Sequence, residues 1–265
     1  MHDVLGPLDL IWLRLRDEAG ALAATEPVLA ELAQRAVLAH AGLAEGIAAR
    51  VASELDHPAV PAAVLERVFR DALAAAPAIL QAVRADLFAV VDRDPASPRM
   101  LQPYLFHKGF AALQAHRLAH WLWHHGRRDL ASYLQSRVSR ALAVDIHPAA
   151  RFGRGIMLDH GTGLVVGETA VVGDDVSILQ GVTLGGTGKE HGDRHPKVGS
   201  HVMIGAGAIV LGNIEIGTGA RIAAGSVVLR PVPPHKTVAG VPARVVGDAG
   251  ADPATSMDQL FDPAI

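Results

Sequence analysis

The sequence predicts an α+β protein in which an α-helical domain precedes a parallel β-helix of hexapeptide repeats. An aliphatic residue recurs every six positions between Val144 and Val232. The preceding segment, residues 1–143, is rich in Ala and Leu at helical spacing and is divided by prolines. Residues 248–265 show no periodicity. We therefore expect a helical domain over 1–143, a β-helix over 144–247 and a flexible tail over 248–265.

The helical domain is predicted from apolar residues at helical spacing between prolines, since proline rarely lies inside a helix. The expected helices span residues 8–21, 27–54, 61–75, 77–92, 104–125 and 128–141. Residues 92–98, which contain Pro95 and Pro98, are expected to form a turn. Much of this surface would be apolar in isolation, so we expect helices to pack between subunits.

The β-helix is predicted from thirteen positions that share an aliphatic or aromatic residue. They are Ile146, Phe152, Leu158, Val166, Val172, Ile178, Leu184, Val198, Ile204, Val210, Ile216, Ile222 and Val228. A six-residue period fits neither an α-helix nor a simple strand but is typical of a hexapeptide β-helix. Stacked coils bury such residues in one continuous column. Glycine often follows the aliphatic residue, and we expect it at corners with an unusual φ angle.

The repeat is interrupted twice, and polar residues gather at both interruptions. Leu158 to Val166 spans eight residues instead of six, and Leu184 to Val198 spans fourteen. A β-helix extrudes extra residues as loops on its surface, often at the binding face. We therefore place the functional site at these interruptions.

Composition excludes several classes of function. The chain has 265 residues, a net charge of −3 and no Cys. The absence of Cys excludes disulfides, thiolate metal sites and a cysteine acyl-enzyme. The absence of a basic block argues against nucleic-acid binding. No signal peptide and no membrane span are expected, so the cytoplasm is the expected location.

Two further patterns have plain explanations. His116, His120 and His124 follow helical i, i+4, i+8 spacing, which suits metal ligands, but no carboxylate or Cys completes a set. We expect a polar helix face and no metal. The segment 185–189 resembles a phosphate loop but lacks the Walker A pattern. It remains a glycine-rich loop whose backbone N–H groups can bind ligand oxygens.

His160, in the first interruption, is the candidate general base. An imidazole can accept a proton near neutral pH when a carboxylate holds its other nitrogen. Asp145 and Asp159 are the candidate carboxylates by chain position.

Several motifs around these residues resemble the serine O-acetyltransferase family. They are Asp145–Ala150, Gly155–Gly163, Val176–Gln180, Val182–Lys189, Gly192–Lys197, Met203–Ala208 and, upstream, Arg93–Ala96, Lys108–Phe110 and His120–Trp123. The resemblance covers residues 80–247 strongly and the first helices loosely. Gly161 and Ala223 depart from the family pattern. The segments Asp-His-x-Thr-Gly and Gly-Asp-Arg-His-Pro-Lys are the specific ones.

The resemblance implies a left-handed β-helix that forms trimers, paired through the helical domains into a hexamer, a dimer of trimers. It implies transfer of an acetyl group from acetyl-CoA to L-serine, the first step of cysteine biosynthesis. His160 would take the proton from the serine hydroxyl, and Asp145 would orient the imidazole. Transfer would be direct, with backbone N–H groups stabilising the oxyanion.

The resemblance also assigns substrate contacts. Asp94 and Asp159 would bind the serine ammonium group, and Arg194 and His195 its carboxylate. The helical domain would thus contribute to the serine site.

Acetyl-CoA would be a co-substrate, with no tightly bound cofactor. The resemblance places it in the groove between neighbouring β-helices. Its matching positions are Gly186 and Thr187 in the loop and the backbones of Ala206 and Ala224.

Two further partners are implied by the resemblance. L-cysteine would be a feedback inhibitor at the serine site, because it differs from serine only in having S for O. The C-terminal Ile265 would insert into the active site of O-acetylserine sulfhydrylase, a pyridoxal-phosphate enzyme.

Three alternatives remain open. Another hexapeptide acyltransferase would use a different donor or acceptor, such as a sugar or homoserine. A metal-dependent hydratase like the γ-class carbonic anhydrases would need His160, His195 and His201 as zinc ligands. A non-catalytic scaffold would bind partners through its tail and helices.

Overall fold

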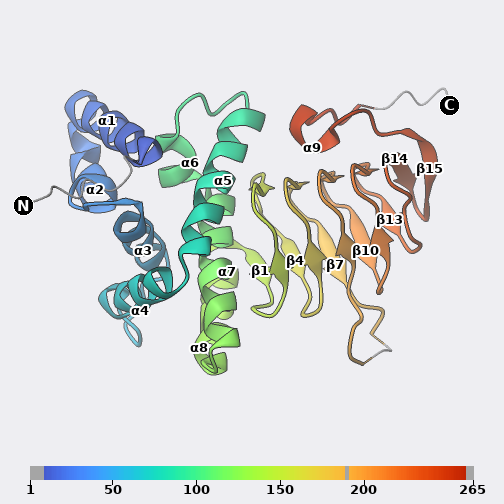
Figure 1. The fold of residues 1–265 in the computed structure, drawn as a ribbon, viewed down its shortest axis with the longest axis horizontal. Helices are drawn as coiled ribbons and strands as arrows, with labels where there is room; N and C mark the ends of the chain where they lie inside the picture. Colours follow the sequence, from blue (N-terminus) through green and yellow to red (C-terminus); the bar gives the residue numbers. More distant parts are fainter. Residues whose placement is uncertain (1–8, 189–190, 261–265) are drawn as a thin grey trace, which may run out of the picture.

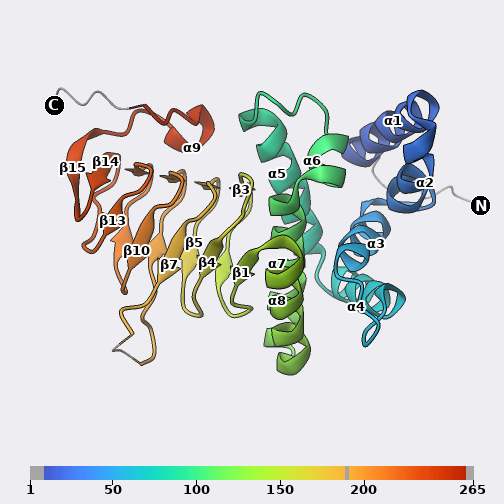
Figure 2. The same ribbon diagram turned by 180° about the vertical axis from the view of Figure 1, so that it is seen from behind.

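The computed structural model describes residues 9–188 and 191–260. A bundle of helices and a prism of stacked strands lie next to each other along the long axis of the molecule (Figure 1). The helices α5 (Pro77–Arg93), α7 (Lys108–His124) and α8 (Arg128–Leu142) lie beside the first coils of the prism, and the helices that precede α5 in the chain lie on the far side of them, as the view from behind also shows (Figure 2). The predicted helical region followed by a parallel β-helix is confirmed.

Prolines mark several boundaries of the helical domain. Its other helices are α1 (Leu10–Thr25), α2 (Ala30–Ala33), α3 (Leu43–Glu54), α4 (Ala62–Ala75) and α6 (Leu101–Phe106), with a 3-10 turn at Pro27–Leu29 and a π turn at Gln34–Leu38. Pro27 follows α1, Pro61 precedes α4 and Pro77 begins α5, although Pro103 lies within α6. Among the described residues, no single helix is both long and apolar enough to cross a bilayer; only α4 and α5 taken together, bent by 102°, have that length and composition.

Two predicted helices, 27–54 and 104–125, are wrong as continuous elements. The first is interrupted before α3, where Gly42 is extended (φ −155°, ψ 172°) and the Glu45 carboxylate accepts a hydrogen bond from the Ala41 N–H at 2.8 Å. The second is interrupted at His107, which is extended (φ −87°, ψ 108°) between α6 and α7. Glycine at position 42 has low helical propensity, and the adjoining Ala41 N–H bonds to a side chain rather than to a helical carbonyl.

The strands form three faces of a prism. The first face contains β1 (Val144–Ile146), β4 (Leu164–Val166), β7 (Thr183–Gly185), β10 (Ile209–Leu211) and β13 (Val227–Val228). The second contains β2 (Arg151–Phe152), β5 (Val171–Val172), β8 (Lys197–Val198) and β11 (Glu215–Ile216). The third contains β3 (Met157–Leu158), β6 (Ser177–Ile178), β9 (Met203–Ile204), β12 (Arg221–Ile222), β14 (Lys236–Gly240) and β15 (Ala243–Asp248).

The strand register confirms the six-residue repeat. On the first face, Val166 pairs with Leu184 and Val210 with Val228, which are 18 residues apart, or three repeats per coil. Ile146 pairs with Val166, and Leu184 with Val210, so these two coils carry two and eight extra residues. All thirteen predicted aliphatic or aromatic positions except Phe152 are buried. The interruptions therefore leave the core column intact.

The expected reason for the repeated glycines is wrong. None of Gly153, Gly173, Gly199, Gly205 and Gly217 has a positive φ. They are needed because the next coil approaches closely: a Cβ at Gly199 would lie 2.7 Å from Thr218 N, and one at Gly205 would lie 2.6 Å from Ala224 N. Positive φ angles occur two residues later, for example at Gly207 (68°) and Gly219 (66°). Space between coils, rather than backbone conformation, selects these glycines.

A buried ion pair joins the helical domain to the first coil. Arg117 on α7 donates to Asp86 on α5 at 2.8 and 2.9 Å and to Gly153 O at 2.6 Å. Asp86, which is fully buried, also accepts from the Ile156 N–H at 3.0 Å. Because the carboxylate has partners on α7 and on the coil, it orients both parts of the fold.

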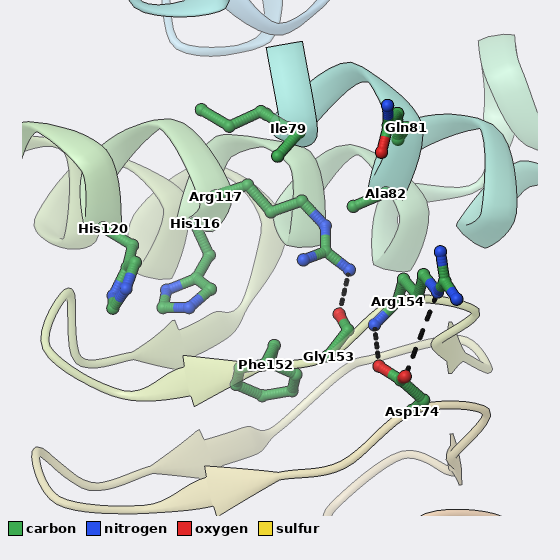
Figure 3. Close-up of a pocket in the computed structure, with 11 residues that line it drawn as sticks. Ile79, Gln81, Ala82, His116, Arg117, His120, Phe152, Gly153, Arg154 and Asp174 are labelled. Carbon is green, nitrogen blue, oxygen red and sulfur yellow. Dashed lines mark hydrogen bonds and ion pairs between the residues drawn. The ribbon is translucent and has the colours of Figure 1, made fainter. Parts of the chain in front are cut away.

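The histidines of α7 line this junction and do not form the expected polar face. His116 is buried against Phe152, with ring centroids 5.1 Å apart, and burial lowers its pKa well below the ordinary value. The His120 Nδ1 lies 2.8 Å from Pro148 O. Both line a cavity of about 420 Å³ between the helices and the β-helix (Figure 3). Only His124 of this group is exposed.

Part of the C-terminal tail is folded, so the prediction of a flexible tail is wrong for this part. After the antiparallel hairpin β14–β15, the short helix α9 (Pro253–Ser256) packs against the third face. Ala254 is fully buried, and its carbonyl accepts a hydrogen bond from Ser177 Oγ at 2.8 Å. Contacts with the β-helix stabilise a segment that has no periodicity of its own.

Candidate active site

The two interruptions lie at two different corners of the prism. We call the turn from the third face to the first face the first corner; it comprises residues 159–163, 179–182, 205–208 and 223–226. The turn from the first face to the second face is the second corner; its described residues are 147–150, 167–170, 186–188, 191–196 and 212–214. The two insertions thus extend opposite edges of the first face.

His160 projects from the first corner. Its side chain is 73% exposed, and its Nε2 lies 3.7 Å from Asp159 Oδ1. The φ of His160 is 55° and that of Gly161 is 71°, whereas in the next coils the left-handed position is a single glycine, Gly181 or Gly207. The two extra residues therefore present a histidine in a conformation that non-glycine residues rarely adopt.

The helical domain brings Asp94 to the same corner. Asp94 ends α5, and its Oδ1 accepts from the Ala96 N–H at 2.8 Å while its Oδ2 accepts from Ser97 Oγ at 2.7 Å. Ser97 Oγ also lies 3.2 Å from His107 Nε2. The predicted turn over 92–98 therefore holds the carboxylate by hydrogen bonds on both oxygens.

The pKa of His107 reflects the charged groups around its ring. Burial lowers the pKa of His107, the negative charges of Asp94 and Asp159 oppose this shift, and His160 lowers it further. All three groups are therefore near the His107 ring. The first corner combines two carboxylates with an exposed imidazole.

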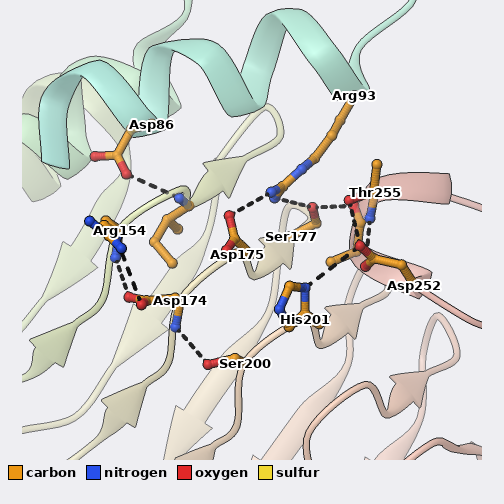
Figure 4. A network of polar contacts seen from close by, with 12 residues as sticks. Asp86, Arg93, Arg154, Asp174, Asp175, Ser177, Ser200, His201, Asp252 and Thr255 are labelled. Atoms are coloured by element: carbon orange, nitrogen blue, oxygen red, sulfur yellow. Dashed lines mark hydrogen bonds and ion pairs between the residues drawn. The ribbon is translucent and has the colours of Figure 1, made fainter.

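Arg93, the last residue of α5 and the residue before Asp94, fixes this end of the helix against the third face. Figure 4 shows Arg93 with Asp175 and Ser177. Arg93 is 7% exposed and donates to Ser177 Oγ at 3.1 Å and to Asp175 Oδ1 at 3.3 Å. Burial lowers the Arg93 pKa, and Asp175 partly opposes this shift. Ser177 in turn donates to Ala254 O of α9. Helix α5, the third face and the tail therefore meet beside the candidate site.

The second corner holds Arg194 and His195 in the long loop. Thr169 Oγ1 accepts from the backbone N–H groups of Arg194 at 3.0 Å and His195 at 3.1 Å, and it lies 2.8 Å from His195 Nδ1. A Cβ at Gly167 would lie 2.0 Å from the His195 ring, so glycine makes room for the imidazole. One threonine of the preceding coil thus organises both residues.

Glu168 is the acidic partner at the second corner. Arg194 Nη2 donates to Glu168 Oε2 at 2.9 Å, and this hydrogen bond lowers the Glu168 pKa. Burial lowers the pKa of His195, and the positive charges of Arg194 and Lys197 lower it further. The corner thus holds a guanidinium in a fixed orientation and a neutral imidazole.

Asp145 belongs with the second corner within one chain. Its Oδ1 accepts from Gln135 Nε2 at 2.7 Å. Asp145, Glu168 and Arg194 all influence the pKa of His147, which burial lowers. No hydrogen bond or ion pair joins Asp145 to His160 within the described part of the chain. The expected His160–Asp145 pair is therefore not formed inside a single chain.

The positions expected to contact coenzyme A also divide between the corners. Gly186 and Thr187 lie in the second-corner loop, whereas Ala206 and Ala224 lie on successive coils of the first corner. Neither alanine N–H donates to another group in the described residues, since the coil-to-coil bond there is made by Gly225 N–H to Ala206 O at 2.8 Å. These N–H groups can therefore donate to a ligand.

The residues that sequence reasoning missed are Ser97, His107, Glu168 and Thr169. The first two flank recognised segments, Arg93–Ala96 and Lys108–Phe110, and the others follow the aliphatic residue at a coil corner. Ile265 lies outside the described residues.

No cluster of three or more His, Asp or Glu in residues 9–188 and 191–260 is arranged to hold a metal ion. The three histidines that a hydratase would need lie at three corners: His160 at the first, His195 at the second and His201 at the turn between β8 and β9. Within one chain they cannot share a metal ion.

Family models match both parts of the chain. The model "Serine acetyltransferase, N-terminal" matches residues 11–115, and "Bacterial transferase hexapeptide (six repeats)" matches residues 195–230. The serine acetyltransferase of Salmonella typhimurium is 56% identical over 256 residues, which is 96% of this chain and 94% of that protein.

Solved structures agree with this relationship. The crystal structure of serine acetyltransferase from Vibrio cholerae has a TM-score of 0.93 and 54% identity, over 95% of this chain and 98% of that chain. The enzyme from Brucella abortus in complex with coenzyme A has a TM-score of 0.90 and 54% identity, over 92% and 97%.

Two other structures carry amino acids. A serine acetyltransferase in complex with cysteine has a TM-score of 0.93 and 51% identity, over 95% of this chain and 98% of that chain. The soybean enzyme complexed with serine has a TM-score of 0.87 and 50% identity, over 89% and 97%. By identity and fold over nearly its whole length, this chain is an acyltransferase and belongs to the serine acetyltransferase family.

Proposed function

We propose that this protein transfers an acetyl group from acetyl-CoA to the hydroxyl of L-serine, giving O-acetyl-L-serine and CoA, as the first step of cysteine biosynthesis. The observation that carries this proposal is the exposed His160 imidazole at a corner that also holds Asp94 and Asp159. A base beside two carboxylates suits an alcohol that also bears an ammonium group. Relatives solved with serine and with coenzyme A support the substrate pair.

The serine site is completed between two chains. The first corner offers groups for an ammonium and a hydroxyl, and the second offers Arg194 and His195 for a carboxylate. The strand β4 between them has three residues, about 10 Å at the usual rise per residue, so the two groups lie at opposite edges of the first face. Packing the first corner of one prism against the second corner of the next unites the two groups.

This arrangement gives Asp145 its proposed role. Because Asp145 lies with the second-corner group, Asp145 of the partner subunit would reach His160 together with Arg194 of the partner subunit. A heterologous contact of this kind closes into a ring, and we propose a trimer. The exposed apolar side chains Leu10, Leu13, Val28 and Leu32 of the helical domain would pair two trimers into a hexamer.

The chemistry follows from the first corner. His160 takes the proton of the serine hydroxyl as its oxygen attacks the thioester carbonyl, and backbone N–H groups stabilise the tetrahedral oxyanion. Collapse breaks the C–S bond, and His160 returns the proton to the leaving sulfur of CoA. Asp94 and Asp159 hold the ammonium group, so the hydroxyl stays next to the imidazole.

Coenzyme A would lie along the first corner. The N–H groups of Ala206 and Ala224, which bond to no other described group, lie at the first corner on later coils than His160. Gly186 and Thr187 of the partner subunit would contact the bound coenzyme A from the other side. Neighbouring coils are about 4.8 Å apart, so His160, Ala206 and Ala224 would contact successive parts of an extended ligand.

Two regulatory partners complete the proposal. L-cysteine would inhibit by occupying the serine site, and a relative solved with cysteine supports this. Ile265 would insert into O-acetylserine sulfhydrylase; deleting Ile265 should abolish the binding of that enzyme, and unchanged binding would refute this part of the proposal.

The test is release of CoA thiol from acetyl-CoA in the presence of L-serine or homoserine. We expect turnover with serine, much less with homoserine, and a loss of about 10²- to 10⁴-fold in kcat for His160→Ala, the usual range for a general base. His124→Ala, an exposed histidine on α7, serves as the control and should keep native activity. A fully active His160→Ala variant would falsify the assignment of the base, and preference for homoserine would refute the acceptor.

A further inference from the structure

Ser97 and His107 lie behind Asp94 and have no assigned role in the reaction. Ser97 is 1% exposed, and its Oγ lies between Asp94 Oδ2 at 2.7 Å and His107 Nε2 at 3.2 Å. Asp94 ends α5, whereas His107 precedes α7. Three polar groups from two helix ends therefore form one continuous hydrogen-bonded path that leads to the carboxylate.

The number of protons fixes the direction of these hydrogen bonds. A serine hydroxyl has one proton, and an ionised carboxylate only accepts, so Ser97 donates to Asp94. The second contact of Ser97 Oγ must then receive a proton from the ring, and His107 donates from Nε2. The tautomer with its proton on Nε2 follows, because one neutral ring carries one proton.

We propose that Ser97 and His107 are positioning residues that hold the Asp94 carboxylate in the orientation that binds the ammonium group of the amino-acid substrate. This inference rests on the proposed function, because it assigns the ammonium group to Asp94. The Ala96 N–H fixes Oδ1 and Ser97 fixes Oδ2, so the carboxylate plane cannot rotate freely. The remaining lone pairs are left for the substrate.

The surroundings of His107 support a neutral donor. Burial lowers its pKa, so the ring does not add a positive charge beside the ammonium site at neutral pH. Helix α7 is held against the first corner, since a Cβ at Gly109 would lie 2.1 Å from Leu158 O. The close contact of Gly109 with Leu158 therefore fixes the start of α7, where His107 lies, next to Asp159 and His160, which follow Leu158 in the chain.

The experiment compares variants that remove the donors with variants that keep them. Ser97→Ala removes the bond to Asp94, whereas Ser97→Thr keeps a hydroxyl. His107→Leu removes the ring donor, whereas His107→Gln offers an amide N–H at the end of the side chain. Ser53→Ala on α3 and His124→Leu on α7 are matched controls at exposed positions. For each full-length variant we would measure kcat, KM for L-serine, KM for acetyl-CoA, the oligomeric state and Tm.

We expect Ser97→Ala and His107→Leu to raise KM for serine about tenfold, as the loss of a hydrogen bond to a charged group predicts, with KM for acetyl-CoA nearly unchanged. Ser97→Thr and His107→Gln should restore KM for serine to within about threefold, which a purely structural defect would not allow. The controls should match the native protein.

Three results would overturn the inference. One is an unchanged KM for serine in a folded Ser97→Ala variant. Another is a parallel rise in both KM values together with a lower Tm, which indicates a structural role. The third is a fall in kcat alone for His107→Gln, which would make His107 a proton-transfer group. A native protein that does not acetylate serine would refute the proposed function itself. That result comes from the native protein alone and is therefore distinct from the three results above.

Discussion

The first and second corners of the β-helix carry the two halves of the candidate site, but they are built differently. At the first corner the coil adds only two residues, and the helical domain supplies Asp94 and His107. At the second corner the coil adds eight residues, and the coil itself supplies Glu168 and Thr169. The comparison teaches that the short insertion depends on the helical domain for its neighbouring polar groups, whereas the long insertion is held by hydrogen bonds to the preceding coil of the β-helix.

The strongest test of this comparison mixes two inactive chains. His160→Ala damages the first corner and Arg194→Ala the second. In a random mixture refolded together, about a quarter of the sites would pair an intact first corner with an intact second corner, because each corner has an even chance. We expect thiol release to rise to about a quarter of the native rate, far above either variant alone.

The matched control mixes His160→Ala with Asp94→Ala. Both changes lie at the first corner of one chain, so no mixed site is intact and activity should stay at the level of the single variants. Equal recovery in both mixtures, or recovery in neither, would show that the two corners do not combine between chains.

A second test changes the geometry of the second corner while keeping its charge. Arg194→Lys keeps the positive charge but loses the planar donor group that pairs with Glu168 and, in our proposal, with the substrate carboxylate. We expect KM for serine to rise about tenfold, since a charged hydrogen bond is lost, with little change in KM for acetyl-CoA. Arg244→Lys, at an exposed position on β15, is the control. An unaltered KM for serine in Arg194→Lys would mean that Arg194 is only a surface charge.

A third test concerns the support that the helical domain gives to the first corner. Gly109→Ala places a methyl group where Leu158 O now lies, 2.1 Å from the new Cβ, so α7 must move away from the coil. We expect a loss of about 1–3 kcal/mol in the free energy of unfolding, as for other overpacked sites, together with lower kcat/KM for serine.

Gly20→Ala on α1 is the matched control, because no atom lies within 4 Å of its added Cβ. There the same change should stabilise the protein by about 0.5–1 kcal/mol, since alanine favours helices. Urea unfolding of both variants provides the measurement. Similar stabilities for Gly109→Ala and Gly20→Ala would show that contact with α7 does not constrain the first corner.

The smallest expected effect is the pH dependence of the Glu168–Arg194 pair. The hydrogen bond from Arg194 lowers the Glu168 pKa below its ordinary value of 4.5 in the folded state. The unfolded chain therefore binds a proton first as the pH falls, so the contribution of the pair is present above pH 4.5 and is lost as the pH drops through the lowered pKa. We expect the Tm of the native protein to fall slightly more between pH 5 and pH 3 than the Tm of Glu168→Gln.

Glu215→Gln on the second face is the control, at an exposed position. Because the Glu168 side chain is 40% exposed, solvent screens the pair and the difference should be small. Identical acid sensitivity of the native protein and Glu168→Gln would show that the pair adds no stability.

The sequence predicted the β-helix well because its repeat is a local property. In a hexapeptide β-helix every sixth residue points into the core, where the coils above and below cover it. The burial of Leu184 and Val210 therefore follows from their spacing in the sequence. The helix boundaries at His107 and Gly42 were missed because no proline marks them, and a single glycine was not treated as the end of a helix. The repeated glycines were correctly noticed but given the wrong reason.

The residues predicted for the site are divided by the structure between two corners of the prism. His160, Asp94 and Asp159 do lie together, as do Arg194 and His195, yet the two sets lie at different corners. The sequence analysis did not assign the two interruptions to corners, because that step needs three repeats per coil, which the strand pairing shows. Ser97 and Thr169 escaped notice because their partners lie on other elements.

By itself, the sequence determined which residues enter the core and where the coil opens, because periodic apolar burial depends only on local spacing. The tertiary structure alone decided which groups meet. The close packing of α7 on Leu158 brings Asp94 and His107 to His160, and three repeats per coil separate His160 from Arg194 by one face of the prism. Contacts of this kind depend on stacking and register, which no short stretch of sequence specifies.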